Sequence, residues 1–248
     1  MRILVLGAGG VGGYFAGRLA QAGTADVTFL VRPARKAQLD RDGLVIESPA
    51  AGNWQAKVQT VLAEDLKPGW DIVLLTAKAY DLESAIAAIR PAMDGKAAVL
   101  PLLNGLSHID ALKAAFGAGN VLGGVAQISA TLAADGTVKH MTPLAALQFG
   151  ELDGTMSGRV TALADAYAAT PIKAAAVPDI MGAMWSKLVF LGTLAAATVL
   201  MRANIGEIAA APGGADWVER LLERNIAVAT AHGHPPQPQM LASYRTTL

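Results

Sequence analysis

The glycine-rich stretch Arg2–Gly13, RILVLGAGGVGG, constrains the fold of this chain more than any other segment. Its apolar run Ile3–Leu6 is typical of a fully buried parallel strand. The run continues into a match to the pattern G-x-G-x-x-G, made of Gly7, Ala8, Gly9, Gly10, Val11 and Gly12. Glycine-rich turns also occur as plain loops, but here a strand precedes the motif and a predicted helix, Val11–Ala22, follows it. This order predicts a dinucleotide-binding site at the start of an α/β fold.

The three glycines of the pattern have different predicted tasks. Gly7 makes the tight turn, Gly9 lets the backbone approach a pyrophosphate, and Gly12 lets the helix pack close to the strand. The helix directs its N-terminal N–H groups and the positive end of its dipole at the phosphates. We therefore expect residues 7–12 to bind the cofactor, and we expect Gly23 to end the helix.

A second strand is predicted from Asp26 to Arg32, and its last residue bears on the choice of cofactor. In NAD-binding sites an acidic residue about 20 positions after the glycine motif binds the ribose 2′-OH. This chain has Arg32 there, followed by Arg35 and Lys36. A guanidinium binds a 2′-phosphate bidentately, whereas a carboxylate repels it. Arg32 therefore predicts NADPH/NADP as the cofactor, and the alternative is a solvated basic loop.

Composition narrows the class of protein. The 248 residues are enough for one large or two ordinary domains, with 20 basic side chains, 20 acidic side chains and no cysteine. The balanced charge predicts no nucleic-acid or membrane partner, and the lack of cysteine excludes disulfides and thiolate chemistry. The chain starts without a basic signal region, and the uncharged run Leu188–Met201 is shorter than a membrane span. We expect a cytoplasmic protein.

Two later strands carry polar residues to the same edge of the expected sheet. Trp70–Thr76 is an apolar run that ends at Ala77-Lys78, and Ala97–Leu103 ends at Asn104-Gly105. Ligands of open α/β sheets lie outside the carboxyl ends of the strands, so Lys78 is well placed for a cofactor or substrate. Asn104 has two interpretations that the spacing leaves open. It is either a ligand of the nicotinamide ribose or of a substrate carbonyl, or a turn residue of an Asn-Gly pair.

The remaining strand patterns are shorter. Two of these strands are separated by the turn Pro49–Asn53. The three strands predicted between residues 121 and 151 are expected to complete the sheet of the earlier strands, partly in an antiparallel way. Helices are predicted over Tyr80–Ile89 and Gly158–Ala169. The strands cover Leu44–Ile46, Ala56–Val61, Val121–Ser129, Thr137–Met141 and Ala145–Glu151, with a last one over Lys173–Val177.

From Pro178 to His232 the pattern is helical, and we place the domain boundary between residues 175 and 176. The first long helix carries Lys187 just before its apolar run. A lysine among buried neighbours is costly unless it snorkels to solvent or faces a cleft, where partial burial makes it a candidate general acid. The residues alone leave both interpretations open. His232 and His234 have no third ligand in view, so no metal site is predicted.

Together these landmarks resemble the ketopantoate reductase (2-dehydropantoate 2-reductase) family over nearly the whole chain. The matching segments are GAGGVGG, Arg32, Thr76-Ala77-Lys78, Leu103-Asn104-Gly105, Gly150-Glu151, Trp185-x-Lys187 and Met201-Arg202-x-x-Ile205-Gly206-Glu207-Ile208. The resemblance implies a Rossmann-type α/β domain over residues 1–175 and an all-α domain over residues 176–248. It implies that the second domain binds substrate and can support a homodimer, with the active site in the cleft between the domains.

The resemblance also implies a reaction, the NADPH-dependent reduction of a 2-oxo acid to a 2-hydroxy acid on the pantothenate route to coenzyme A. By similarity, Lys187 stabilises the charge that grows on the carbonyl oxygen and delivers the proton, which favours catalysis over snorkelling. Asn104 would lie near the nicotinamide and the substrate, and Lys78 would belong to the cofactor site.

This chain departs from the family pattern where the family commonly carries asparagines that bind substrate. The corresponding residues here are Leu191, Ala195 and Ile205, whose side chains cannot hydrogen-bond. Two alternatives to ketopantoate reduction follow, a paralogous reductase of a more apolar 2-oxo acid and a non-catalytic NADP(H)-binding sensor. The family also continues beyond the last residue of this chain, so we expect the helical domain to be incomplete at its C-terminus.

Overall fold

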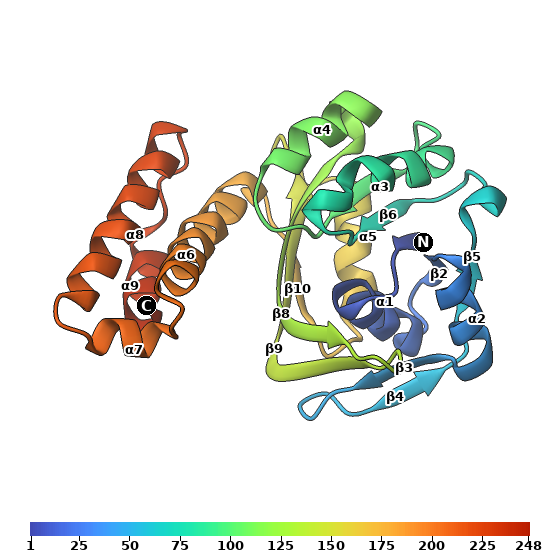
Figure 1. Cartoon of the computed structure of the whole chain (residues 1–248). Helices are drawn as coiled ribbons and strands as arrows, with labels where there is room; N and C mark the ends of the chain where they lie inside the picture. Colours follow the sequence, from blue (N-terminus) through green and yellow to red (C-terminus); the bar gives the residue numbers. More distant parts are fainter. The chain divides into compact units, whose positions relative to one another are not determined.

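The computed structural model describes all 248 residues and divides into two compact units, Met1–Ile180 and Met181–Leu248. The first unit is an α/β domain and the second consists of helices (Figure 1), which confirms the predicted fold class. The division falls at the first turn of a long helix, α6 (Ile180–Met201), whereas the boundary predicted from the sequence lies before residue 176.

A parallel sheet of five strands forms the centre of the N-terminal unit. Its strand order is β5-β2-β1-β6-β7, and every neighbouring pair is parallel. All residues of β6 and β7 are buried, as expected for strands that are covered on both faces. Because β2 and β5 lie on one side of β1 and β6 and β7 on the other, the order reverses between β1 and β6. The strands are β1 (Arg2–Leu6), β2 (Asp26–Leu30), β5 (Gln59–Val61), β6 (Ile72–Leu75) and β7 (Ala98–Pro101).

The other strands form a second sheet, so the prediction that Val121–Ser129, Thr137–Met141 and Ala145–Glu151 complete the first sheet is wrong. The strand predicted over Ala56–Val61 is divided, because β4 belongs to the second sheet and β5 to the first. β8 (Leu122–Leu132) and β9 (Val138–Glu151) make a long antiparallel hairpin with an irregularity between Ile128 and Ala130. β9 is continuous where two strands were predicted, and it also pairs in parallel with β3 and β10. One isolated bridge, between Val99 and Val121, connects β7 to the start of β8. The remaining members are β3 (Leu44–Glu47), β4 (Trp54–Ala56) and β10 (Lys173–Ala176).

The physical reason for the second sheet is helix α1 (Gly10–Ala22), which contacts strands of both sheets. Its residues Gly12–Leu19 are all buried, so the helix needs cover on two sides. The aromatic rings of Tyr14 and Phe15 lie in one core with Phe29 of β2 and Phe149 of β9. The helix ends as predicted, with Gly23 in the left-handed conformation.

The other helices of this unit lie at the ends of strands. α2 (Pro33–Asp42) begins directly after Arg32, its N-cap, and has a proline at its first position. For this reason β2 ends at Leu30 and not at the predicted Arg32. The helix predicted over Tyr80–Ile89 is a 3₁₀ turn, Ala79–Asp81, followed by α3 (Leu82–Ile89). The prediction lacks α2 and α4 (Ser107–Phe116). The remaining elements are α5 (Gly158–Tyr167) and 3₁₀ turns over Ala63–Asp65, Arg90–Ala92 and Ala118–Asn120.

In the C-terminal unit, α6 packs against α8 (Gly214–Ala231) and α9 (Pro238–Thr247). Val189, Leu222 and Tyr244 are buried where these three helices meet. The short helix α7 (Ile205–Ala210) begins with a capping box, in which the Asn204 side chain and the Glu207 side chain each accept the other residue's backbone N–H. Helix α9 lies beyond the helical region that the sequence predicts.

Helix α6 is long and apolar enough to cross a membrane by length and composition alone. Val199, Leu200 and Met201 at its C-terminal end are exposed. Because the core helix of a water-soluble protein passes the same test, this single helix is weak evidence for a membrane span.

Candidate functional site

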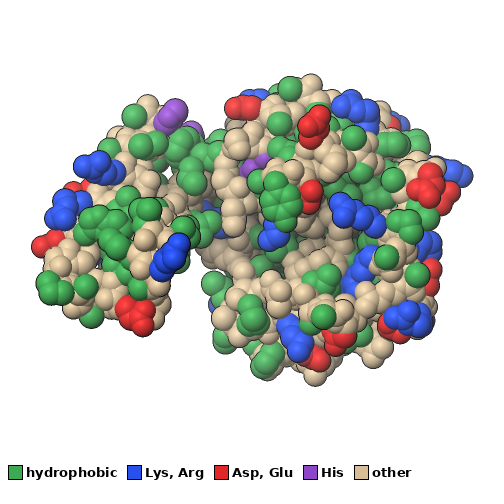
Figure 2. All heavy atoms as spheres, in the orientation of Figure 1, with side chains coloured by type: hydrophobic (Ala, Val, Ile, Leu, Met, Phe, Trp, Pro, Cys, Tyr) green, Lys and Arg blue, Asp and Glu red, His purple; other side chains and the backbone are tan.

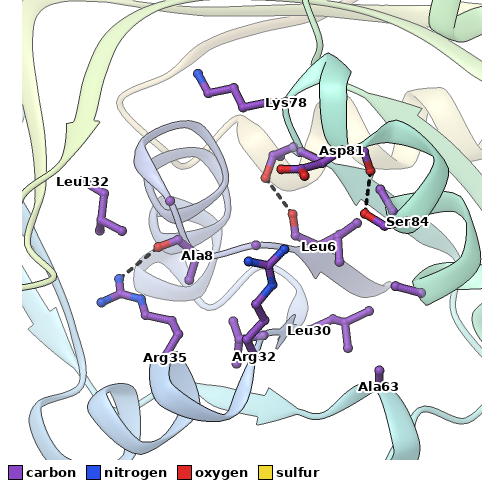
Figure 3. Close-up of a pocket in the computed structure, with 17 residues that line it drawn as sticks. Leu6, Ala8, Leu30, Arg32, Arg35, Ala63, Lys78, Asp81, Ser84 and Leu132 are labelled. Carbon is purple, nitrogen blue, oxygen red and sulfur yellow. Dashed lines mark hydrogen bonds between the residues drawn. The ribbon is translucent and has the colours of Figure 1, made fainter.

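A cavity of about 690 Å³ opens at the carboxyl ends of β1, β2 and β6, where the strand order reverses. Its wall combines the glycine-rich loop, the start of α2, the segment after β6, one side of α3 and the tip of β8 (Figure 3). The lining residues are Leu6, Gly7, Ala8, Gly9, Leu30, Val31, Arg32, Arg35, Ala63, Thr76, Ala77, Lys78, Asp81, Ser84, Ala85, Ala88 and Leu132.

The structure brings only part of the predicted cofactor set to this cavity. The predicted residues that line it are Gly7, Ala8, Gly9, Arg32 and Lys78. Three others form the first turn of α1 without lining the cavity, and they are Gly10, Val11 and Gly12. These assignments as cofactor ligands stay predictions.

Two glycines of the motif have the conformations and contacts that their predicted packing roles require. Gly7 has a φ of 97°, a backbone conformation that side chains rarely adopt. At Gly12 an added Cβ would collide with the carbonyl oxygen of Gly7 and would lie 2.5 Å from Oγ1 of Thr76. At Gly9, by contrast, a Cβ would meet no atom within 4 Å. Gly9 thus leaves open space at the cavity wall, as the predicted approach of a pyrophosphate requires.

Gly10 is also tightly surrounded, although its place in the sequence pattern does not indicate this. A Cβ at Gly10 would lie 2.7 Å from the carbonyl oxygen of Ala130, a residue of β8 in the second sheet. The β8–β9 hairpin therefore packs directly on the start of α1. A pattern of glycines alone does not identify this partner, because the contact depends on how the hairpin folds back.

The N-terminus of α1 is electrostatically suited to an anion. Gly9 is its N-cap and provides no capping side chain, and no acidic residue lies in the first turn. The helix dipole and the unpaired backbone N–H groups thus leave partial positive charge beside the cavity. Over the face drawn in Figure 2, Lys and Arg side chains are interspersed with Asp and Glu, so the helix end adds a local feature to a surface of mixed charge.

The three basic residues after β2 have different surroundings. Arg32 is exposed, and Figure 3 shows its guanidinium among the lining residues. Arg35 donates from Nη2 to the carbonyl oxygen of Ala8 at 2.9 Å and from Nη1 to Oε1 of Gln38 at 2.7 Å. Lys36 instead pairs with Asp40 at 2.9 Å. Of the three, Arg32 is the one whose charged group the protein itself does not engage in a hydrogen bond or ion pair.

The opposite wall comes from the segment after β6. Thr76 donates its hydroxyl to the carbonyl oxygen of Leu6 at 2.8 Å, which joins the ends of β6 and β1. Lys78 and Asp81 line the cavity on this side, and the Ser84 hydroxyl donates to the carbonyl oxygen of Asp81 at 2.9 Å. Lys78 is exposed, as expected for a side chain at the rim of a site.

Asn104 lies three residues beyond the end of β7 and is exposed. It is not among the residues that line the cavity, and Gly105 beside it has a φ of 87°. The local conformation fits the turn interpretation of the Asn-Gly pair, while the proposed contact of Asn104 with a nicotinamide or a substrate stays a prediction.

Lys187 belongs to the C-terminal unit, on α6. Burial lowers the pKa of its ammonium group from the ordinary value of a lysine. The helix is fixed next to it, because the Tyr244 hydroxyl of α9 donates to the carbonyl oxygen of Ser186 at 2.8 Å. The shift in pKa is in the direction that a general acid near neutral pH requires.

The two histidines that follow α8 lie against Trp185 of α6. The rings of His232 and His234 stack on the indole with centroids 5.0 and 5.8 Å away. No group of three or more His, Cys, Asp or Glu side chains in the structure could hold a metal ion. The histidines thus take part in an aromatic cluster.

Several residues that line the cavity were not predicted as site residues. Leu132 belongs to the second sheet and comes to the cavity only because the hairpin tip lies over the glycine-rich loop. Arg35 had a signal, since it follows Arg32 by three positions, about one turn of a helix. Because α2 was not predicted, the sequence did not indicate that Arg35 lies one helical turn after Arg32.

Comparison with known proteins gives matches over both units. A model of the family "Ketopantoate reductase PanE/ApbA" matches residues 3–154, and a model of its C-terminal domain matches residues 179–248. The chain is 34% identical to an uncharacterized oxidoreductase, YkpB, of Bacillus subtilis over 99% of this chain and 80% of that protein. It is 27% identical to a 2-dehydropantoate 2-reductase of Halobacterium salinarum over 94% of this chain and 76% of that protein.

Solved structures give the same result. A crystal structure of 2-dehydropantoate 2-reductase from Geobacter metallireducens superimposes with a TM-score of 0.89 at 27% identity. The match covers all of this chain and 82% of the other.

Proposed function

This chain belongs to the ketopantoate reductase family of oxidoreductases, and we propose that it reduces a 2-oxo acid to the 2-hydroxy acid with NADPH as the hydride donor. The observation that carries the choice of NADPH is Arg32, an exposed guanidinium at the cavity that the protein leaves without a carboxylate partner. A group of this kind binds a phosphate through two parallel hydrogen bonds.

The residues around the cavity fit a dinucleotide. The uncapped N-terminus of α1 and the open space at Gly9 suit a pyrophosphate, and Arg32 suits the 2′-phosphate. The lining residues Ala63, Ala85 and Ala88 have small apolar side chains, which suit contact with a flat purine ring. When bound, NADPH supplies the hydride that reduces the keto carbon.

Lys187 has the chemistry to supply the proton. Reduction of a ketone places negative charge on its oxygen, and a nearby ammonium stabilises that charge and then protonates the oxygen. Because burial lowers the pKa of Lys187, its ammonium gives up a proton more readily than an exposed lysine does. We propose Lys187 as the general acid, and Asn104 and Lys78 as further ligands of substrate and cofactor.

A second candidate, within the same reaction class, is a reductase of an apolar 2-oxo acid. Helix α6 is continuous from Ile180 to Met201, so Lys187, Leu191 and Ala195 share one face. Ketopantoate carries a hydroxyl group that needs a hydrogen-bond partner, and each missing partner costs ~1 to 3 kcal/mol of binding. An oxo acid with a plain alkyl tail loses less, so we propose a preference for 2-oxoisovalerate over ketopantoate.

The test follows the absorbance of the reduced nicotinamide with ketopantoate and 2-oxoisovalerate, in the wild type and in Leu191→Asn/Ala195→Asn. We expect the wild type to have the higher kcat/KM on 2-oxoisovalerate and the double variant to gain on ketopantoate. A wild type that strongly prefers ketopantoate, with no gain in the variant, would mean that other residues hold the substrate. Tight binding of NADPH with no turnover of any 2-oxo acid would instead identify a sensor.

A further inference from the structure

We propose that Arg35 is a positioning residue of the cofactor site, which orients the Ala8–Gly9 peptide of the glycine-rich loop for a pyrophosphate and does not itself read the 2′-phosphate. The proposal rests on the proposed binding of a dinucleotide, and it separates the work of two arginines that line the same cavity. Arg32 would discriminate between NADPH and NADH, whereas Arg35 would serve both cofactors equally.

The first argument comes from the hydrogen bonds of Arg35. Its Nη2 donates to the carbonyl oxygen of Ala8 at 2.9 Å, and its Nη1 donates to Gln38 at 2.7 Å. Both ends of the guanidinium fork are therefore engaged by the protein, and Nε is buried without a partner. Arg32 at the same cavity has no such bonds, so it is the better donor of a bidentate pair to a phosphate.

The second argument comes from the geometry of a peptide unit. In a planar trans peptide the C=O of one residue and the N–H of the next point in opposite directions. By holding the carbonyl oxygen of Ala8, Arg35 fixes the direction of the N–H of Gly9, which is the N-cap of α1. A pyrophosphate binds to backbone N–H groups of this loop, so their direction decides how strongly it binds.

The third argument is the connection to the second sheet. Gln38, which accepts from Arg35, donates from Nε2 to the carbonyl oxygen of Asp135 at 2.6 Å, in the turn between β8 and β9. A Cβ at Gly136 in the same turn would lie 2.5 Å from Nη1 of Arg35. The turn thus packs on the guanidinium and holds it in place against Ala8.

The electrostatics argue against stabilisation of the α1 dipole as the reason for this arrangement. A cation at the N-terminus of a helix opposes the helix dipole, and no acidic residue in the first turn of α1 compensates it. The cation is favourable there when the site binds an anion. This sign agrees with a role in cofactor binding and disagrees with a role in helix capping.

The experiment measures the dissociation constants of NADPH and NADH for the wild type, Arg35→Gln, Arg35→Lys, Arg32→Gln and a control, Arg41→Gln. Arg41 lies on the same helix and pairs only with Asp42 at the surface. We expect Arg35→Gln to weaken both cofactors by about tenfold, the scale of one charged hydrogen bond. Arg32→Gln should weaken NADPH alone, and Arg41→Gln should weaken neither. Arg35→Lys, which can still donate to Ala8, should recover part of the loss.

ADP and AMP provide a second readout, because they differ by the phosphate that the loop would bind. In Arg35→Gln the advantage of ADP over AMP should shrink, while in Arg32→Gln it should persist. If Arg35→Gln does not fold, Arg35→Lys must still show a smaller advantage of ADP than the wild type, and an unchanged advantage overturns the proposal.

Two other results overturn the proposal alone. One is a loss in Arg35→Gln confined to NADPH, which would make Arg35 a ligand of the 2′-phosphate. The other is unchanged binding in Arg35→Gln beside a selective loss in Arg32→Gln. A wild type that binds neither NADPH nor NADH would overturn the proposed function as well.

Discussion

The glycine-rich loop allows a test that separates packing from ligand binding, because two of its glycines differ in what surrounds them. Gly12→Ala places a methyl group against the carbonyl oxygen of Gly7, which belongs to the backbone and cannot rotate away. Overpacking of this kind costs ~1 to 3 kcal/mol, and the better helix propensity of alanine returns at most ~1 kcal/mol. Because the added Cβ would also meet Oγ1 of Thr76, we take the upper end of this cost and expect Gly12→Ala to lower the free energy of unfolding by about 2 kcal/mol.

Gly9→Ala should have the opposite profile. Its methyl group enters open space, and the φ of −88° at Gly9 is accessible to alanine. Alanine is a poorer N-cap than glycine, which lowers the free energy of unfolding. It also lowers the conformational entropy of the unfolded chain, which raises the free energy of unfolding by ~0.4 to 1 kcal/mol, so the two effects nearly cancel. The same methyl group would occupy the place of a bound pyrophosphate. Displacement of the pyrophosphate by this methyl group would break at least one charged hydrogen bond to the loop, so we expect NADPH binding to weaken by ~1.5 to 3 kcal/mol.

Urea unfolding measures the free energy of unfolding of both variants, and titration with NADPH measures their affinity for the cofactor. Equal losses of stability in the two variants would refute the assignment of separate roles. So would a Gly9→Ala protein that binds NADPH as tightly as the wild type, since the backbone at Gly9 would then not approach the cofactor.

Arg32→Asp should weaken NADPH by ~1.5 to 3 kcal/mol and NADH much less; equal weakening in titrations would mean that Arg32 does not contact the 2′-phosphate. Lys187→Ala should keep its NADPH affinity but lose ~100-fold in turnover, and unchanged turnover would make Lys187 a snorkelling residue. Burial lowers the pKa of His108 from 6.5 to about 4, so between these values the unfolded state binds more protons and stability falls as the pH falls. His108→Gln should remove up to about 3 kcal/mol of this acid destabilisation, as measured by urea unfolding near neutral pH and near pH 4, and an unchanged pH dependence would contradict the assignment.

The start of the N-terminal unit was predictable because its signals are local. A buried strand, a glycine turn and a helix follow one another within residues 2–22, and each has its own pattern. The prediction that β2 ends at Arg32, when it ends at Leu30, is wrong for a local reason. Pro33 fixes the start of α2, and the apolar run before it hides the point at which the strand stops.

The second sheet was not predictable from strand patterns, because alternation indicates a strand and not its partner. One signal was available in α1, whose sequence GVGGYFAGRLA is small or apolar on nearly all sides. A helix of that kind is buried all round, which requires a further layer beyond the parallel sheet. The layer that covers it is the sheet of β3, β4, β8, β9 and β10.

The residues of the candidate site also differ in predictability according to the sheet that contributes them. Arg32 and Lys78 follow strands of the parallel sheet, and the rule that ligands lie at carboxyl ends of strands found them. Leu132 and the Gln38–Asp135 contact depend on how far the β8–β9 hairpin extends, which no single segment encodes. Strand patterns thus predict the residues that reach the cavity from the parallel sheet, and they miss those that reach it from the second sheet.

The contacts of the glycine-rich loop show why a match to G-x-G-x-x-G alone is weak evidence of binding. The contact of Gly12 with Gly7 belongs to the parallel sheet, and that of Gly10 with Ala130 belongs to the second sheet, so both glycines are required whether or not a ligand binds. Among the glycines of the motif, only Gly9 has no neighbouring atom that would exclude a larger side chain. The inference of a dinucleotide therefore depends on Gly9, on the uncapped end of α1 and on the unpaired Arg32, which are the places where the packing of the protein gives no reason for the residue that is present.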